Sequence, residues 1–97
     1  MANPLELNRA APAGRIEVFA IRDESYPGGW FYRFQCYHPE DGEILRYDNA
    51  HDDDTLGPHH RHIRFGTDTE IEFHSLVVHV TRFLNEVEEL ETSENTP

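Results

Sequence analysis

The spacing of apolar residues changes once along this chain, at about residue 74, and this change constrains the fold more than any other feature. Before that point apolar residues recur at every second position, most clearly in "WFYRFQCYH" from Trp30 to His38, a pattern typical of β-strands. Beyond it they recur at every third or fourth position, which predicts an amphipathic helix to about Glu91. Its apolar stripe consists of Leu76, Val77, Val80, Phe83, Leu84, Val87 and Leu90. The pattern predicts an α+β fold whose strands precede one C-terminal helix.

Turn-forming residues divide the first part of the chain into separate strands. Residues 15–23 are rich in β-formers, and "PEDG" is a tight connection that predicts a hairpin between residues 30–38 and 43–49. Residues 59–65 read as a fourth strand and residues 69–73 as a short fifth. We therefore predict a small antiparallel sheet of four to five strands with the C-terminal amphipathic helix packed on one face. The other face is then left for a groove or a partner.

The length of 97 residues suits one domain with a modest core. We expect residues 1–14, with two prolines and a glycine, to form a flexible N-terminal arm. Residues 15–92 then form a single α+β domain, and residues 93–97 a disordered tail. The lone Cys36 cannot form an internal disulfide, and we recognise neither a signal peptide nor an apolar run of membrane-spanning length. These features favour a cytoplasmic protein.

The charge balance is unusual, because 19 acidic residues face eight basic ones and give a formal net charge of −11. All eight basic residues are arginines. An acidic chain without lysine indicates adaptation to a high-salt cytoplasm, where carboxylates keep a protein soluble. At ~1 M salt the Debye length is only ~3 Å, so distant carboxylates scarcely repel a phosphate. The acidity therefore does not exclude RNA as a partner.

The stretch "RYDNAHDDDTLGPHHRH", from Arg46 to His62, concentrates the side chains that can do chemistry. Alternation places Ile44, Arg46 and Asp48 on one face of the third strand, opposite Leu45, Tyr47 and Asn49. In the fourth strand it places His60, His62 and Arg64 on one face, opposite His59, Arg61, Ile63 and Phe65. The pairing register then decides which of these residues meet across strands, and the sequence does not specify it.

One interpretation of this stretch is metal-independent cleavage of RNA, which requires no cofactor. Histidine suits proton transfer near neutral pH, and arginine offers a forked cationic donor for phosphate. We predict His60 and His62 as the proton-transfer residues, with Arg46 and Asp48 completing the catalytic set. The predicted substrate-binding residues are Arg33, Tyr47, Asn49, His59, Arg61 and Arg64.

Two other functions remain open from the residues alone. A metal could be held by His51, His60 and His62, or with an aspartate as third ligand, although the spacing fits no established metal motif. The arginine and tyrosine cluster could also form a protein interface. The simplest interpretation of "DDDT" is a solvated loop, and the row from Trp30 to Cys36 is most simply part of the core.

The order of two short motifs resembles the TumE family of toxins from bacterial and archaeal toxin–antitoxin modules. Arg46, Asp48, Asn49 and Ala50 match an "R-x-D-N-A" segment, and Pro58, His59, His60 and His62 match "P-H-H-K-H" with arginine in place of lysine. The likeness runs from about Gly28 to Leu90. It implies a growth-arresting toxin neutralised by a cognate antitoxin with a helix-turn-helix DNA-binding region. Together with the charge balance, it favours a halophilic archaeon as the source. RNA is an expected target, no membrane association is expected, and homo-oligomerisation stays open.

The charge pattern generates a prediction about salt. We expect the free energy of unfolding to be higher in molar KCl than at low salt, because screening relieves repulsion among the carboxylates. Denaturant titration at the two salt concentrations measures the difference. Equal stability in both conditions would count against salt adaptation.

Overall fold

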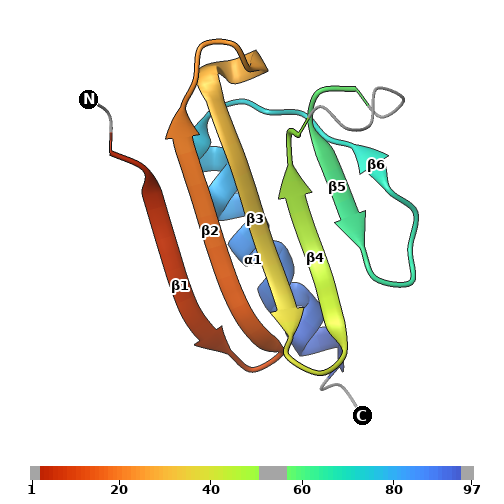
Figure 1. Ribbon diagram of the computed structural model, residues 1–97. Helices are drawn as coiled ribbons and strands as arrows, with labels where there is room; N and C mark the ends of the chain where they lie inside the picture. Colours follow the sequence, from red (N-terminus) through yellow and green to blue (C-terminus); the bar gives the residue numbers. More distant parts are fainter. Residues whose placement is uncertain (1–2, 51–56, 95–97) are drawn as a thin grey trace.

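The computed structural model describes residues 3–50 and 57–94, and in these residues the chain forms six strands and one α-helix. The sheet is antiparallel throughout, with its strands in chain order (Figure 1). The elements are β1 (Leu5–Ala11), β2 (Gly14–Arg22), the 3₁₀ turn η1 (Pro27–Gly29), β3 (Trp30–His38), β4 (Gly42–Asp48), β5 (His60–Ile63), β6 (Thr69–Glu70) and α1 (Leu76–Glu94). This confirms the α+β class and the C-terminal helix, with one strand more than predicted.

The additional strand is β1, which lies where the sequence predicts a flexible arm. Leu5 pairs with Ala20 and Ala11 with Gly14, so β1 forms one edge of the sheet. Its sequence "LELNRAA" contains few β-forming residues, and its strand conformation therefore depends on pairing with β2. A side chain at residue 14 would begin 2.2 Å from the carbonyl oxygen of Tyr37, which explains why glycine occupies the connection between β1 and β2.

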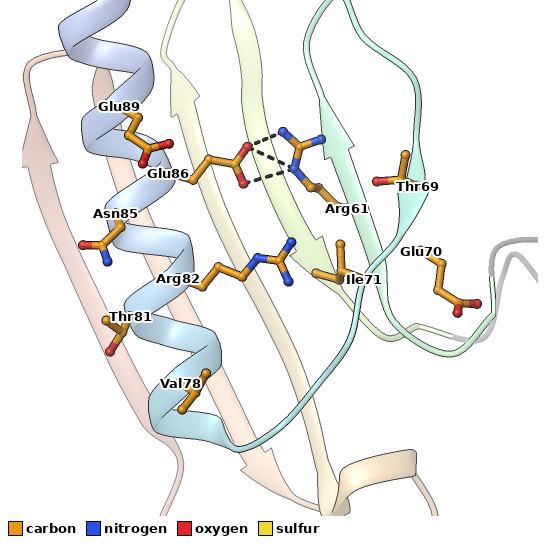
Figure 2. A pocket seen from close by; sticks show the side chains of 10 residues that line it. All are labelled: Arg61, Thr69, Glu70, Ile71, Val78, Thr81, Arg82, Asn85, Glu86 and Glu89. Carbon is orange, nitrogen blue, oxygen red and sulfur yellow. Dashed lines mark hydrogen bonds and ion pairs between the residues drawn. The ribbon is translucent and has the colours of Figure 1, made fainter.

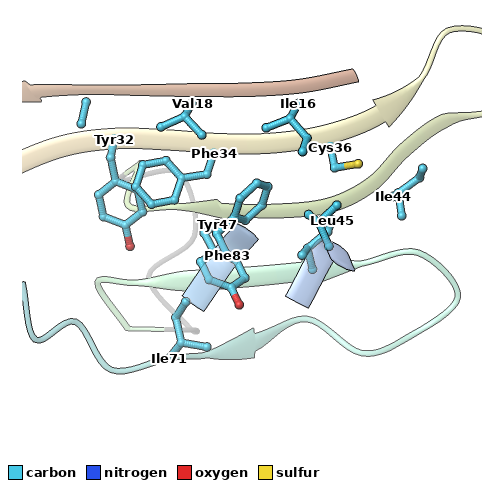
Figure 3. Packing of buried hydrophobic residues seen from close by; sticks show 12 residues of the cluster. Ile16, Val18, Tyr32, Phe34, Cys36, Ile44, Leu45, Tyr47, Ile71 and Phe83 are labelled. Carbon is cyan, nitrogen blue, oxygen red and sulfur yellow. The ribbon is translucent and has the colours of Figure 1, made fainter. Parts of the chain in front are cut away.

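The core lies between one face of the sheet and α1, which runs behind β2, β3 and β4 in Figure 1. Alternate residues of these strands point toward the helix, where Phe83 meets them (Figure 3). Val87 of the helix belongs to the same cluster. The strand residues in this core are Ile16, Val18, Ala20, Tyr32, Phe34, Cys36, Ile44, Leu45 and Tyr47. The predicted inward orientation of Tyr32, Phe34 and Cys36 is confirmed. None of the described helices is both long and apolar enough to cross a membrane.

A β-bulge in β4 changes the predicted orientation of one residue. The pairing shifts between Cys36, opposite Leu45, and Tyr37, opposite Glu43, so Ile44 has no partner on β3. Ile44 therefore joins the core beside Leu45 instead of sharing a face with Arg46 and Asp48. Beyond the bulge the alternation resumes as predicted.

The start of α1 has a local cause. The N–H of Val78 donates to Ser75 Oγ at 3.2 Å, so Ser75 caps the first turn. The helix begins at Leu76, close to the predicted start near His74.

Three buried polar side chains form a hydrogen-bonded chain within the core. The Tyr32 hydroxyl lies 2.9 Å from His59 Nδ1 and 2.9 Å from His79 Nε2. A hydroxyl carries one proton, so it donates to one histidine and accepts an N–H from the other. Burial, aided by the neighbouring His59, lowers the pKa of His79 to about 4. Burial also lowers the pKa of His59, so both rings are neutral near pH 7.

The hydrogen-bonded group of Tyr32, His59 and His79 predicts that the folded protein loses stability in mild acid. The pKa of His79 is about 4 in the folded protein and 6.5 in an unfolded chain, so unfolding takes up a proton between these values. Its contribution is complete above about pH 6.5 and falls as pH decreases toward 4, by up to about 3 kcal/mol.

We expect His79→Gln to reduce this pH dependence, because glutamine can bond to Tyr32 but cannot titrate. Urea unfolding at several pH values measures it. The matched control is His74→Gln, which changes an exposed histidine at the start of the helix region. Equal pH dependence in both variants would contradict the assignment.

Candidate functional site

The sheet face opposite α1 carries two rows of polar side chains that cross β3, β4 and β5. In the first row, Arg33 lies opposite Asp48, and Asp48 lies opposite His60. In the second row, Gln35 lies opposite Arg46, which lies opposite His62. The register therefore brings all four predicted catalytic residues, Arg46, Asp48, His60 and His62, together with Arg33 on one open face.

Asp48 lies at the centre of this group, and it is only 6% exposed. Its Oδ2 is 2.6 Å from Arg46 Nε and 3.8 Å from His62 Nε2, and its Oδ1 is 3.3 Å from His60 Nδ1. The buried Nε–H of Arg46 is not aligned with an acceptor among the described residues, so its contact with Asp48 is an ion pair without a directed hydrogen bond. Arg46 also contacts Glu43 at 3.0 Å. The carboxylate thus joins two strands through three basic side chains.

His60 is buried and held from both sides. Its Nε2 donates to the carbonyl oxygen of Gly57 at 2.6 Å, while its Nδ1 faces Asp48. Gly57 has a φ of +74°, and a Cβ there would overlap the carboxylate of Glu70, so this position requires glycine. His60 therefore supports the position of Asp48 from beneath the surface.

His62 is the histidine of the group that is open to solvent, with a side chain 16% exposed. Its Nδ1 lies 3.0 Å from Asp68 Oδ2, and its Nε2 faces Asp48. A carboxylate that holds one nitrogen of an imidazole fixes the orientation of the ring and leaves the other nitrogen for proton transfer. This arrangement suits a group that exchanges a proton with a ligand.

Beside Asp48 the surface has a hollow of about 200 Å³. It is lined by Phe31, Tyr32, Arg33, Arg46, Asp48 and Ala50. Arg33 is exposed and forms no ion pair with a residue in the described part of the chain. Its guanidinium is therefore available to an anion, and the hollow places that anion next to Arg46.

Four other predicted site residues point to the opposite side of the sheet, toward α1. Asn49 accepts the N–H of Tyr32 at 3.1 Å and donates to the carbonyl oxygen of Trp30 at 2.6 Å, so it ties the end of β4 to β3. His59 belongs to the buried chain with Tyr32. The remaining two, Tyr47 and Arg61, contact helix α1.

Tyr47 and Arg61 both donate to the carboxylate of Glu86 on α1. Figure 2 shows the contact of Arg61 with Glu86. Burial works against ionisation of Glu86, but these hydrogen bonds outweigh it and lower the pKa of its carboxyl. Arg61 and Glu86 both line a groove of about 740 Å³ between α1 and the β5–β6 hairpin. These contacts fasten β5 to the helix.

One predicted position lies away from the cluster, and another lies outside the described residues. Arg64 follows β5 and is exposed, with its guanidinium carbon 4.8 Å from the ring centroid of Phe65. His51, part of the alternative metal set, lies outside the described residues.

The structure does place one set of metal-ligating atoms together. One oxygen of Asp48 and one nitrogen each of His60 and His62 lie within 4.8 Å of one another. Two histidines and a carboxylate form a reasonable donor set for a divalent cation. The guanidinium of Arg46 already neutralises Asp48, however, and would repel a second cation there.

Several neighbours of the site were missed by reasoning from sequence. Asp68 and the Gly57 carbonyl reach the histidines only because β5 pairs with β4 and a turn follows it. Glu43 reaches Arg46 because of the bulge at Ile44. Each contact joins residues only three to six positions apart, but it depends on a turn or a bulge that strand alternation alone does not predict.

Comparison with known proteins gives one match. A family model described as Toxin TumE matches residues 10–91, which covers most of the chain. Neither the curated proteins nor the solved structures contain a match.

The position of Asp48 predicts a large stability effect of its charge. We expect Asp48→Asn to destabilise the fold by about 3 kcal/mol, because it removes the more buried of the two carboxylates that pair with the partly buried Arg46 and leaves only Glu43. Asp68→Asn is the matched control, and its half-exposed carboxylate should cost less than about 1 kcal/mol. Urea unfolding at neutral pH measures both values. Similar losses in the two variants would show that Asp48 does not hold the cluster.

Proposed function

The chain belongs to the TumE toxin family, and from this premise we propose that it arrests growth by cutting RNA without a metal ion. The proposed site of cleavage is the group formed by Arg46, Asp48, His60 and His62, called the Asp48 cluster below. As the toxin of a toxin–antitoxin pair it has a cognate antitoxin. We further propose that this antitoxin carries a helix-turn-helix DNA-binding region and that the toxin acts in the cytoplasm.

One observation carries the proposal of RNA cleavage. Arg33, Arg46 and Asp48 line one hollow, and His62 Nε2 lies 3.8 Å from the carboxylate of Asp48, so cations for a phosphate and a group for proton transfer lie within one cluster. Cleavage through the ribose 2′-hydroxyl needs a base for that hydroxyl and cations for the charge that develops on phosphorus. The cluster supplies both.

The burial of the side chains supports the following division of roles. His62 accepts the proton of the 2′-hydroxyl as the 2′-oxygen attacks phosphorus, and the bond to the 5′-oxygen breaks with a proton supplied by water. Arg33 and Arg46 hold the phosphate oxygens. Asp48 orients His62 and Arg46. The buried His60 is a positioning residue that holds Asp48 in place, instead of the proton-transfer residue expected from sequence.

A metal-dependent version of the same reaction is the second candidate, because Asp48, His60 and His62 offer three ligand atoms within 4.8 Å of one another. In that case a cation would replace Arg46 as the counter-ion of Asp48. A third possibility is a toxin that blocks its target by binding alone. The assay below separates all three.

We expect His62→Gln to lower the rate of RNA cleavage roughly 10²- to 10⁴-fold, which is the usual size of a general acid–base contribution. Purified protein is incubated with total RNA in the presence and absence of EDTA. His74→Gln, which changes an exposed histidine outside the cluster, should keep full activity.

Each result of this assay has a distinct meaning. Cleavage that resists EDTA and requires His62 supports the proposal. Cleavage abolished by EDTA overturns the metal-independent mechanism in favour of a cation at Asp48. If the purified protein cuts no RNA although its expression in cells arrests growth, the proposed enzymatic function is wrong and target blocking replaces it.

A further inference from the structure

Two phenylalanines lie on the open face beside the cluster, at positions that the proposed chemistry does not use. Phe19 on β2 lies opposite Arg33, on the side of that arginine away from Asp48. Phe31 on β3 is two residues before Arg33 and so shares its face. The two rings pack edge to face with centroids 6.3 Å apart, and Tyr26 supports Phe31 at 5.1 Å. All three rings are partly exposed.

These rings border a second hollow that adjoins the first. It measures about 310 Å³ and is lined by Glu17, Phe19, Phe31, Arg33 and Gln35. Phe31 and Arg33 also line the hollow beside Asp48, so the two spaces share one wall. Phe19 and Asp48 lie two strands apart, about 10 Å along the sheet at the usual strand spacing. A single nucleotide can span that distance from its phosphate to its base.

The charges around the second hollow exclude a phosphate and admit a base. Glu17 lines it, and Glu6 lies opposite Phe19 on β1. These carboxylates repel an anion, while the aromatic faces and the amide of Gln35 suit a flat, uncharged heterocycle. Arg33 lies between the two hollows, where it can contact the phosphate and lie against the edge of a base.

We propose that Phe19 and Phe31 form a binding subsite for an unpaired nucleobase, adjacent to the phosphate held at the Asp48 cluster. The inference rests on the proposed function for the identity of the ligand, and it assigns single-stranded RNA as the substrate class. Exposed aromatic residues on an open sheet stack on splayed bases of single strands, whereas the bases of a duplex are already stacked inside the helix. Stacking is largely independent of ionic screening, so it also serves a protein whose charge contacts are weakened by salt.

The test separates binding from cleavage. The probe is a short fluorescein-labelled oligoribonucleotide whose 2′-hydroxyls are methylated, so it lacks the attacking oxygen and stays intact. Fluorescence anisotropy gives its Kd for the wild-type protein and for Phe19→Leu/Phe31→Leu, which keeps apolar bulk but removes the aromatic faces. We expect the double variant to bind about tenfold more weakly.

Two controls accompany this measurement. Phe65→Leu makes the same change at a phenylalanine that is 96% exposed and lies beyond β5, and it should leave the Kd unchanged. A duplex of the same methylated strand should bind more weakly than the single strand. Thermal unfolding of every variant checks that the sheet is intact.

The outcomes distinguish this inference from the proposed function. Weaker binding by the double variant, with no RNA cleavage by the wild type, supports the subsite and overturns the nuclease function. Unchanged binding by a folded double variant, with cleavage intact, overturns the subsite and leaves the function standing. Equal affinity for duplex and single strand, or no binding of either probe by the wild type, also overturns the subsite.

Discussion

A nearly buried carboxylate on an open sheet face is costly unless a counter-ion and polar neighbours surround it, and Asp48 satisfies this requirement by pairing with Arg46 and lying beside two histidines. The same contacts join β4 to β5, which are otherwise held together by a short ladder of four residue pairs. Removing the carboxylate would leave Arg46 with Glu43 as its counter-ion, take away the oxygen beside His60 Nδ1, and weaken the attachment of β5. The geometry of the proposed site and the integrity of this edge of the sheet thus depend on one ion-pair cluster, in which Asp48 has the central position.

The consecutive histidines His59 and His60 show how alternation separates chemistry from packing. His59 points toward α1, stacks on Phe73 with ring centroids 5.0 Å apart, and shares the Tyr32 hydroxyl with His79. Burial keeps that ring neutral. His60 points the other way, and both of its nitrogens face oxygen acceptors, a carboxylate and a carbonyl. An adjacent pair that looks like a single histidine motif in the sequence therefore serves a structural role with one residue and supports the proposed site with the other.

The predictable parts of this protein are those governed by local periodicity. Alternation correctly oriented Tyr32, Phe34 and Cys36 inward, and it placed Arg46 with Asp48 and His60 with His62. The register between neighbouring strands was not predictable, because backbone hydrogen bonds are the same in every register. The bulge at Ile44 and the β1 strand follow from this register, and the position of Asp68 beside His62 follows from the turn after β5. Asn49 illustrates the same limit, since its role depends on lying next to the backbone of Tyr32 and Trp30.

Register also explains how an acidic chain can gather cationic groups on one face. The net charge of −11 is spread over the whole molecule, but the pairing of β3, β4 and β5 gathers Arg33, Arg46 and His62 within two rows of one face. In concentrated salt only contacts within a few ångströms keep their Coulombic strength, so recognition depends on this local arrangement and not on the total charge. In the proposed complex, a phosphate would form close ion pairs with Arg33 and Arg46, while a base would stack on Phe19 and Phe31. Stacking depends little on salt concentration, so it would complement ion pairs that act only at short range. In the proposed complex, the carboxylates of Glu6 and Glu17 would favour the uncharged part of a nucleotide in the second hollow.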